Sequence, residues 1–192
     1  MENQTKKSKA LSSIIDYVEL FVVAVCIVIV LFSIAFRTCT VDGDSMNKTL
    51  LNEEVLVVSD IMYTPDRGDI IVFHQTDNSN IANKNKPLVK RVIGVGGDTV
   101  TIDYDTWTVS VTDKNGETST LDEDYIHLSQ RGSYFSGVKE YKVPEGSLFV
   151  LGDNRNESLD SRYADIGYVD ARRVLGKVVM RVAPISRFGI ID

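Results

Sequence analysis

The sequence predicts a mostly β protein: one N-terminal transmembrane helix, followed by a folded domain built as a barrel or sandwich of short strands. Three observations support this fold class. The chain has 192 residues, 43% hydrophobic and 25% charged, which suits one domain with an appendage. A long uncharged run lies near the N-terminus. Beyond it there is no long segment of helical period, but there are many short runs rich in β-branched residues.

The uncharged run, LFVVAVCIVIVLFSIAF, covers residues 20–36. At ~1.5 Å per residue a helix of this length covers about 25 Å, and apolar residues before it extend it toward the thickness of a bilayer core. We therefore expect a membrane anchor over residues 13–36. A cleaved signal peptide is the alternative, because the small residues Ser33 and Ala35 have the spacing of a cleavage site. The apolar run is long for such a peptide.

Charges on the two sides of this run predict its orientation. Three lysines lie among the first nine residues, and only Arg37 closely follows the run. The positive-inside rule then places residues 1–12 in the cytoplasm and residues 37–192 outside the membrane.

After the anchor, seven runs have the composition of strands and are separated by Gly, Pro and Asn turn signals. The face on which apolar residues lie changes between Tyr104 and Trp107, which predicts a hairpin turn near Asp105 and Thr106. The expected strands cover residues 54–60, 69–74, 87–95, 98–104, 107–111, 146–153 and 174–182.

Composition excludes several classes of partner. The net charge is −6 and the pI is near 5.0, and no basic stripe occurs beyond the N-terminus, so we expect no nucleic-acid partner. Histidine, cysteine and acidic residues do not occur at the spacing of a metal site. We therefore expect neither a metal nor a cofactor.

A candidate nucleophile, Ser45, lies in the stretch VDGDSMNKTL, residues 41–50. A serine hydroxyl is a poor nucleophile unless a base accepts its proton. The chain has two histidines, His74 and His127. Neither has a recognisable motif around it, and we interpret both as surface or boundary residues.

Lys90 is a different kind of candidate base. The period of a strand places Leu88, Lys90 and Val92 on one face, so Lys90 is the one polar residue on an apolar face. Burial there would lower the lysine pKa from its usual value of ~10.4. A neutral amine could then accept the proton of Ser45. The alternative is a lysine at a sheet edge with its amine in water.

Four stretches follow the apolar run in a fixed order: GDSMNKTL, RGDIIVF, KRVIGVGGD and GDNRNESLDSR. With these stretches the chain resembles the bacterial type I signal peptidases over about residues 40–180. The resemblance implies a membrane-bound serine endopeptidase that removes signal peptides from exported preproteins. Its expected partners are signal-peptide-bearing preproteins and membrane lipid, and the expected state is a monomer. The single span is more like the Gram-positive forms.

The resemblance also implies roles for individual residues. Ser45, followed by Met46, matches the nucleophile; Lys90 matches the general base; and Ser158 matches a serine that hydrogen-bonds the base. The backbone N–H of Ser45 would help to hold the oxyanion, because Gly43 stands where some members have a serine. A supporting segment would comprise Asp153, Asn154, Arg155, Asp160, Ser161 and Arg162.

In the family the catalytic domain carries a smaller, more variable β subdomain, which here would cover about residues 103–146. Besides Gly43, two departures occur: Lys48 stands where many members have proline, and Asn156-Glu157 stands where Asp-Asn is usual. The alternative function is a non-catalytic, membrane-anchored binding module on the same fold. The presence of Ser45, Lys90 and Ser158 together argues against this alternative.

Overall fold

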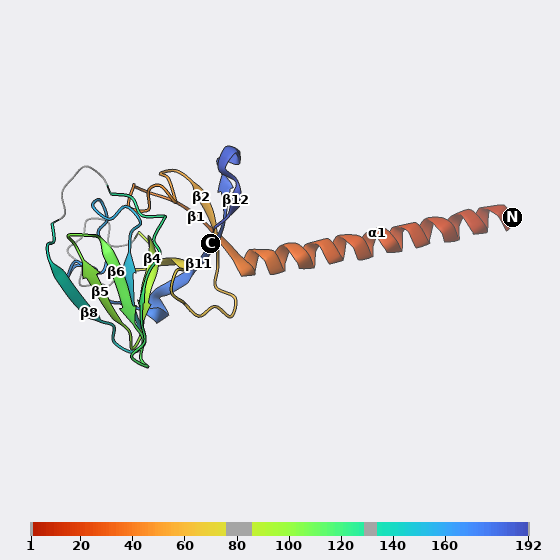
Figure 1. Cartoon of the computed structure of the whole chain (residues 1–192). Coiled ribbons are helices and arrows are strands. Elements are labelled where there is room, and N and C mark those ends of the chain that lie inside the picture. The colour runs from red at the N-terminus through yellow and green to blue at the C-terminus, as the bar shows by residue number, and fades with distance from the viewer. Residues whose placement is uncertain (1, 76–85, 129–133, 192) are drawn as a thin grey trace. The chain divides into compact units, whose positions relative to one another are not determined.

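The computed structural model describes residues 2–75, 86–128 and 134–191, which form two compact units, Met1–Arg37 and Thr38–Asp192. The first unit is the helix α1 (Glu2–Ala35), which begins well before the predicted anchor (Figure 1). Large apolar side chains on α1, such as Phe21 and Ile29, are exposed. Within the described part of the chain, no helix has both the length and the apolar character that a membrane span requires. The anchor over 13–36 therefore stays a prediction.

The second unit is mostly β, as predicted. Its larger sheet has the strand order β1-β2-β11-β3-β4-β9-β10, and β12 pairs with β11. The strand β11 forms antiparallel pairs with both β2 and β3, so the last long strand of the chain lies between two early ones. The strands of this sheet are β1 (Phe36–Thr40), β2 (Val55–Ser59), β3 (Ile70–Phe73), β4 (Leu88–Val95), β9 (Ser147–Leu151), β10 (Val169–Asp170), β11 (Val174–Ala183) and β12 (Gly189–Ile190).

A second sheet has the order β7-β6-β5-β8. Figure 1 shows its strands β5, β6 and β8 side by side. The strands β5 and β6 form the predicted hairpin, in which Asp103 pairs with Thr108 and the turn covers 104–107. Trp107 has a φ of 57° in this turn. The strands are β5 (Thr99–Asp103), β6 (Thr108–Thr112), β7 (Thr118–Thr120) and β8 (Val138–Lys142).

Each of the seven predicted strands is confirmed to within a few residues. The predictions missed the strands β1, β7, β8, β10 and β12. They also missed two 3-10 helices, η1 (Ala171–Arg173) and η2 (Ile185–Arg187).

Alternation along β4 places its side chains on two faces of the larger sheet. Val92 belongs to a buried cluster that includes Ile71 and Phe73. Val89 packs against a different cluster, which includes Met46 and Val72. Lys90 pairs with Ile71 in the register of β3 and β4, so the lysine shares the face of the first cluster, as the strand period predicts.

Candidate active site

Ser45 lies in a turn segment that hydrogen bonds fix at both ends. Before it, the N–H of Val41 donates to the carbonyl of Glu54 at 2.9 Å. After it, the N–H of Leu50 donates to the carbonyl of Met46 at 2.8 Å. Met46 is buried in the core, so its side chain anchors the segment to the core. Ser45 itself is partly exposed.

Lys90 reaches this serine from β4. Its Nζ lies 2.6 Å from Ser45 Oγ and 3.0 Å from the carbonyl oxygen of Val89. The lysine is only 3% exposed. Burial is the largest influence on its pKa and lowers it to about 8, because an environment without water disfavours the charged form of the amine. Asp160 and Asp153 oppose this shift by their negative charge.

The segment from 152 to 162 holds the turn of Ser45 in place. The N–H of Asn154 donates to the carbonyl of Ser45 at 3.0 Å, and its Nδ2 donates to the carbonyl of Asp44 at 3.0 Å. Asp153 accepts hydrogen bonds from Arg91 Nε and Nη2 at 3.0 and 2.9 Å, and from Thr49 Oγ1 at 2.6 Å. The predicted residues Asp153 and Asn154 therefore contact the segment that carries the serine.

The other predicted members of this segment bond mainly to one another and to β9. Asp160 accepts the N–H of Gly152 at 3.0 Å and Arg162 Nε at 2.7 Å. Arg162 Nη2 donates to the carbonyl of Arg155 at 2.7 Å. Ser161 Oγ accepts the N–H of Val150 at 2.9 Å. All of these groups are buried, and such charges are stable in an interior only when paired.

Ser158 differs from what the resemblance implies. It is 4% exposed, and its Oγ has no hydrogen-bond partner within the described residues, so it makes no hydrogen bond to Lys90 here. The side chain instead packs against Gly152, where a Cβ would lie 2.2 Å from Ser158 Oγ. The lysine nitrogen takes Ser45 and the Val89 carbonyl as its partners.

Three residues that bond to the supporting segment were not singled out from the sequence: Thr49 and Arg91, which contact Asp153, and Glu123. Glu123 forms a buried ion pair with Arg155. It lies among several acidic residues after β7, and no local pattern distinguishes it from its neighbours. His127 contacts the supporting segment only through its backbone among the bonds described: its N–H donates to the carbonyl of Asp153 at 2.8 Å. His74 is exposed.

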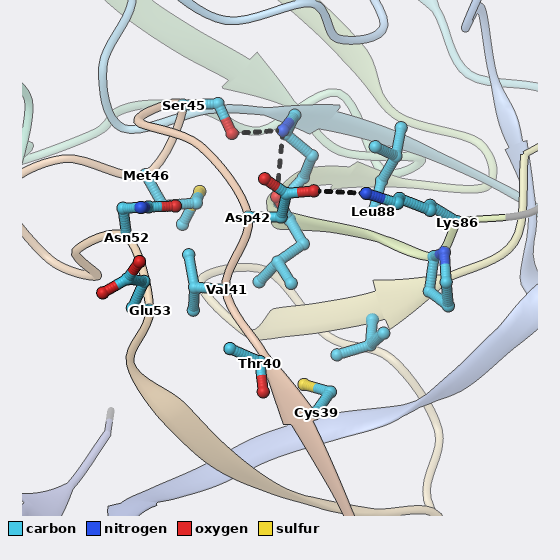
Figure 2. A pocket seen from close by; sticks show the side chains of 14 residues that line it. Cys39, Thr40, Val41, Asp42, Ser45, Met46, Asn52, Glu53, Lys86 and Leu88 are labelled. Atoms are coloured by element: carbon cyan, nitrogen blue, oxygen red, sulfur yellow. Dashed lines mark hydrogen bonds and ion pairs between the residues drawn. The ribbon is translucent and has the colours of Figure 1, made fainter. Parts of the chain in front are cut away.

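A cavity of about 520 Å³ opens beside Ser45 and Lys90 (Figure 2). Much of its lining is apolar and comes from the segment before Ser45 and from the start of β4. A smaller cavity of about 250 Å³ also contains Ser45 and Lys90, together with Asp44, Gln75 and Leu159. The apolar lining residues of the larger cavity are Cys39, Val41, Met46, Val72, Pro87, Leu88 and Val89.

A family described as signal peptidase, peptidase S26, matches residues 14–183. The chain belongs to this family. Membership makes it a serine endopeptidase of the signal peptidase type and confirms the resemblance predicted from four short stretches.

Similar proteins are also named as signal peptidases. Signal peptidase IB of Staphylococcus aureus strain COL is 33% identical over 192 residues, which cover 91% of this chain and 92% of the relative. A probable signal peptidase I-2 of Synechocystis is 34% identical over 170 residues, 84% of this chain and 72% of the relative. A solved signal peptidase I of Enterococcus faecalis V583 is 32% identical, with a TM-score of 0.44. The match covers 60% of this chain and 97% of the solved one.

Proposed function

We propose that this signal peptidase removes signal peptides from exported preproteins, with Ser45 as the nucleophile and Lys90 as the general base. The observation that carries the proposal is the distance of 2.6 Å between Lys90 Nζ and Ser45 Oγ. It is supported by the burial of the lysine, because an amine with a pKa near 8 is neutral in a useful fraction of molecules near neutral pH.

The reaction follows from this pair. Ser45 donates its proton to the neutral Lys90 amine as Oγ attacks the carbonyl carbon of the scissile bond. The lysine then gives that proton to the leaving amine, and an acyl-enzyme remains. Lys90 next removes a proton from a water molecule, which attacks the ester and releases the signal peptide. Ser45 recovers its proton from the lysine at the end.

The oxyanion needs hydrogen-bond donors at the carbonyl oxygen, and we assign one of them to the N–H of Ser45. Within the described residues this N–H donates to no protein acceptor. The N–H of Gly43 is already engaged with Asn52 Oδ1 at 2.8 Å. We further propose that Asp153, Asn154, Arg155, Asp160, Ser161 and Arg162 support the site by holding the turn of Ser45, and that Ser158 orients the lysine when a peptide is bound.

The substrate would bind as an extended strand in the larger cavity. Both backbone groups of Val41 bond to the 53–54 segment, because its N–H donates to Glu54 and its carbonyl accepts from Glu53. Within the described residues, the backbone groups of the next residue, Asp42, make no backbone hydrogen bond and are available to a peptide. The apolar walls suit small side chains before the cleaved bond.

For the cellular setting, we propose that α1 anchors the chain in the membrane over residues 13–36, with 1–12 cytoplasmic and 37–192 extracytoplasmic. The apolar run and the exposed apolar side chains of α1 support this proposal. We also propose a monomer with a small β subdomain at about 103–146. Membrane fractionation, followed by protease digestion from one side, tests the anchor and its orientation. Recovery in the soluble fraction would contradict both.

The activity is tested by cleavage of several preproteins in detergent micelles or lipid. We expect the wild-type protein to release signal peptides, and Ser45→Ala and Lys90→Ala to lower kcat/KM by at least about 10³-fold. The exposed Ser186→Ala is the matched control and should cleave normally. Full activity in Lys90→Ala would remove the lysine from the mechanism, and no cleavage by the wild type would refute the proposed function.

A further inference from the structure

An ion pair connects the two walls of the larger cavity. Lys86 Nζ lies 2.7 Å from Asp42 Oδ2. Asp42 belongs to the segment that leads into Ser45, whereas Lys86 precedes β4, which carries Lys90. All four residues line the same cavity. Figure 2 shows the side chain of Lys86 extended toward Asp42, next to Leu88.

The ion pair lies at the mouth of the cavity. The side chains of Lys86 and Asp42 are 60% and 71% exposed, whereas Met46 and Val72 in the lining are buried. The hydrogen bond and the charge of Lys86 hold the pKa of Asp42 below its usual range, so the carboxylate is ionised near neutral pH. The apolar interior of the cavity is therefore covered by a charged contact that faces solvent.

A bound peptide strand needs the space between these walls. Neighbouring strands lie about 4.8 Å apart, so a peptide between Asp42 and the start of β4 needs roughly twice that distance between the two backbones. A peptide that approaches from solvent meets the contact of Asp42 with Lys86 before it reaches the apolar lining.

We propose that Asp42 and Lys86 form a bridge across the substrate groove, and that a peptide substrate must separate the two side chains to bind. The inference rests on the proposed function, since it takes this cavity as the peptide groove. It makes Asp42 and Lys86 determinants of substrate affinity that act before the chemical step.

The size and the salt dependence of the effect follow from the exposure of the pair. An exposed ion pair contributes little free energy, so its removal should tighten peptide binding by about two- to fivefold. Salt screens exposed charges, so higher ionic strength should tighten the binding of a neutral peptide to the wild-type chain. Without the bridge this dependence should be absent.

The experiment measures the Kd of a labelled, uncharged peptide with small residues before the cleaved bond. The full chain carries Ser45→Ala, so that the peptide is not cut, and is held in a non-ionic detergent. In this background we compare Asp42→Asn, Lys86→Gln, the double variant, and the charge exchange Asp42→Lys with Lys86→Asp. Asp170→Asn is the matched control, because it removes one charge of the surface pair of Asp170 with Arg172, in which Asp170 is partly exposed, outside both cavities.

We expect each neutral single variant and the double variant to bind the peptide equally well, two- to fivefold more tightly than the parent and without salt dependence. The charge exchange should restore the parent affinity and its salt dependence. Equal or weaker binding by the double variant, or unchanged salt dependence, would overturn the bridge. A wild-type chain that binds peptides but cleaves none would instead contradict the proposed function, and the two failures remain distinguishable.

Discussion

Gly152 lies so close to Ser45 that a Cβ on the glycine would be 2.4 Å from the serine carbonyl oxygen. The same Cβ would be 2.2 Å from Ser158 Oγ. The backbone of the supporting segment therefore packs directly against the turn that carries the candidate nucleophile, and only glycine fits between them.

This contact makes Gly152→Ala a test of how accurately Ser45 must be placed. The added methyl group has to move the serine carbonyl or Ser158, and a displacement of about 1 Å at a nucleophile can lower the rate by ~10²-fold. Overpacking should also lower the free energy of unfolding by about 1–3 kcal/mol. Steady-state kinetics with a fluorogenic peptide and thermal unfolding measure the two effects.

Gly189→Ala is the control, because a Cβ at Gly189 has no atom within 4 Å and the residue needs no positive φ. It should match the wild type in both measurements. A Gly152→Ala protein with wild-type kcat/KM would contradict the close packing around Ser45.

The lowered pKa of Lys90 predicts the pH dependence of the reaction. The base must be neutral to accept a proton, so kcat/KM should rise with pH and reach half of its maximum near pH 8. The profile is measured with a peptide that does not titrate between pH 6 and pH 10. A rate that is flat across this window, or that falls as pH rises, would contradict a lysine base.

The same burial predicts that Lys90 destabilises the fold near neutral pH. Its pKa is lowered from 10.5 in water to about 8, so between these values the unfolded chain keeps a proton that the folded chain releases. The free energy of unfolding should therefore rise through this window, by ~3 kcal/mol from this group alone.

Replacement by an apolar residue of similar shape separates stability from activity. We expect Lys90→Met to be inactive, yet more stable than the wild type at pH 7 by about 1–2 kcal/mol, because no amine has to be buried. This advantage should disappear by about pH 10. Urea unfolding at both pH values measures it, and a variant less stable than the wild type at pH 7 would contradict the argument.

The pair of Arg91 and Asp153 should contribute strongly to the free energy of unfolding. Their side chains are 6% and 1% exposed. Removing one partner of a buried pair leaves an uncompensated charge and costs about 3–5 kcal/mol, so we expect Asp153→Ala to unfold at much lower urea concentration. The joint change Arg91→Met with Asp153→Leu should recover part of the loss. If the single and the joint variants lose similar amounts of unfolding free energy, charge pairing is not the cause of the loss.

Ser158 offers a contrasting prediction. Its buried hydroxyl lacks a partner within the described residues, so Ser158→Ala should keep or slightly raise the free energy of unfolding. If the hydroxyl turns to the lysine when a peptide binds, kcat should fall by about tenfold while KM changes little. A loss of stability above ~2 kcal/mol would instead assign Ser158 to the structure of the segment.

Much of the larger sheet follows from local sequence. The strands β2, β3, β4 and β11 are runs of β-branched residues that pack in the interior, so composition and period identify them. The same alternation was enough to place Lys90 on an apolar face, because a side chain period of two leaves little freedom once a strand is buried on that face.

The elements that were missed lack such a signal. The strand β8 has the sequence VKEYK and is mostly exposed at an edge of its sheet, where it pairs with β5 across more than thirty residues of chain. The ion pairs of Glu123 with Arg155 and of Asp42 with Lys86 also depend on segments far apart in sequence. Contacts of this kind are set by tertiary structure. Neither the strand propensity of a residue nor the alternation of apolar residues in a short run predicts them.

The bonds that Asn154 makes to the backbone of Ser45 and Asp44 join segments about 110 residues apart. The segment that supports the candidate nucleophile covers residues 152–162, and the strand β11, inserted between β2 and β3, follows it in the sequence. The turn of Ser45 can therefore be held in place only after these later segments have folded onto it. A chain that lacks residues 152–183 should keep Ser45 and Lys90 but lose the contacts that position the serine.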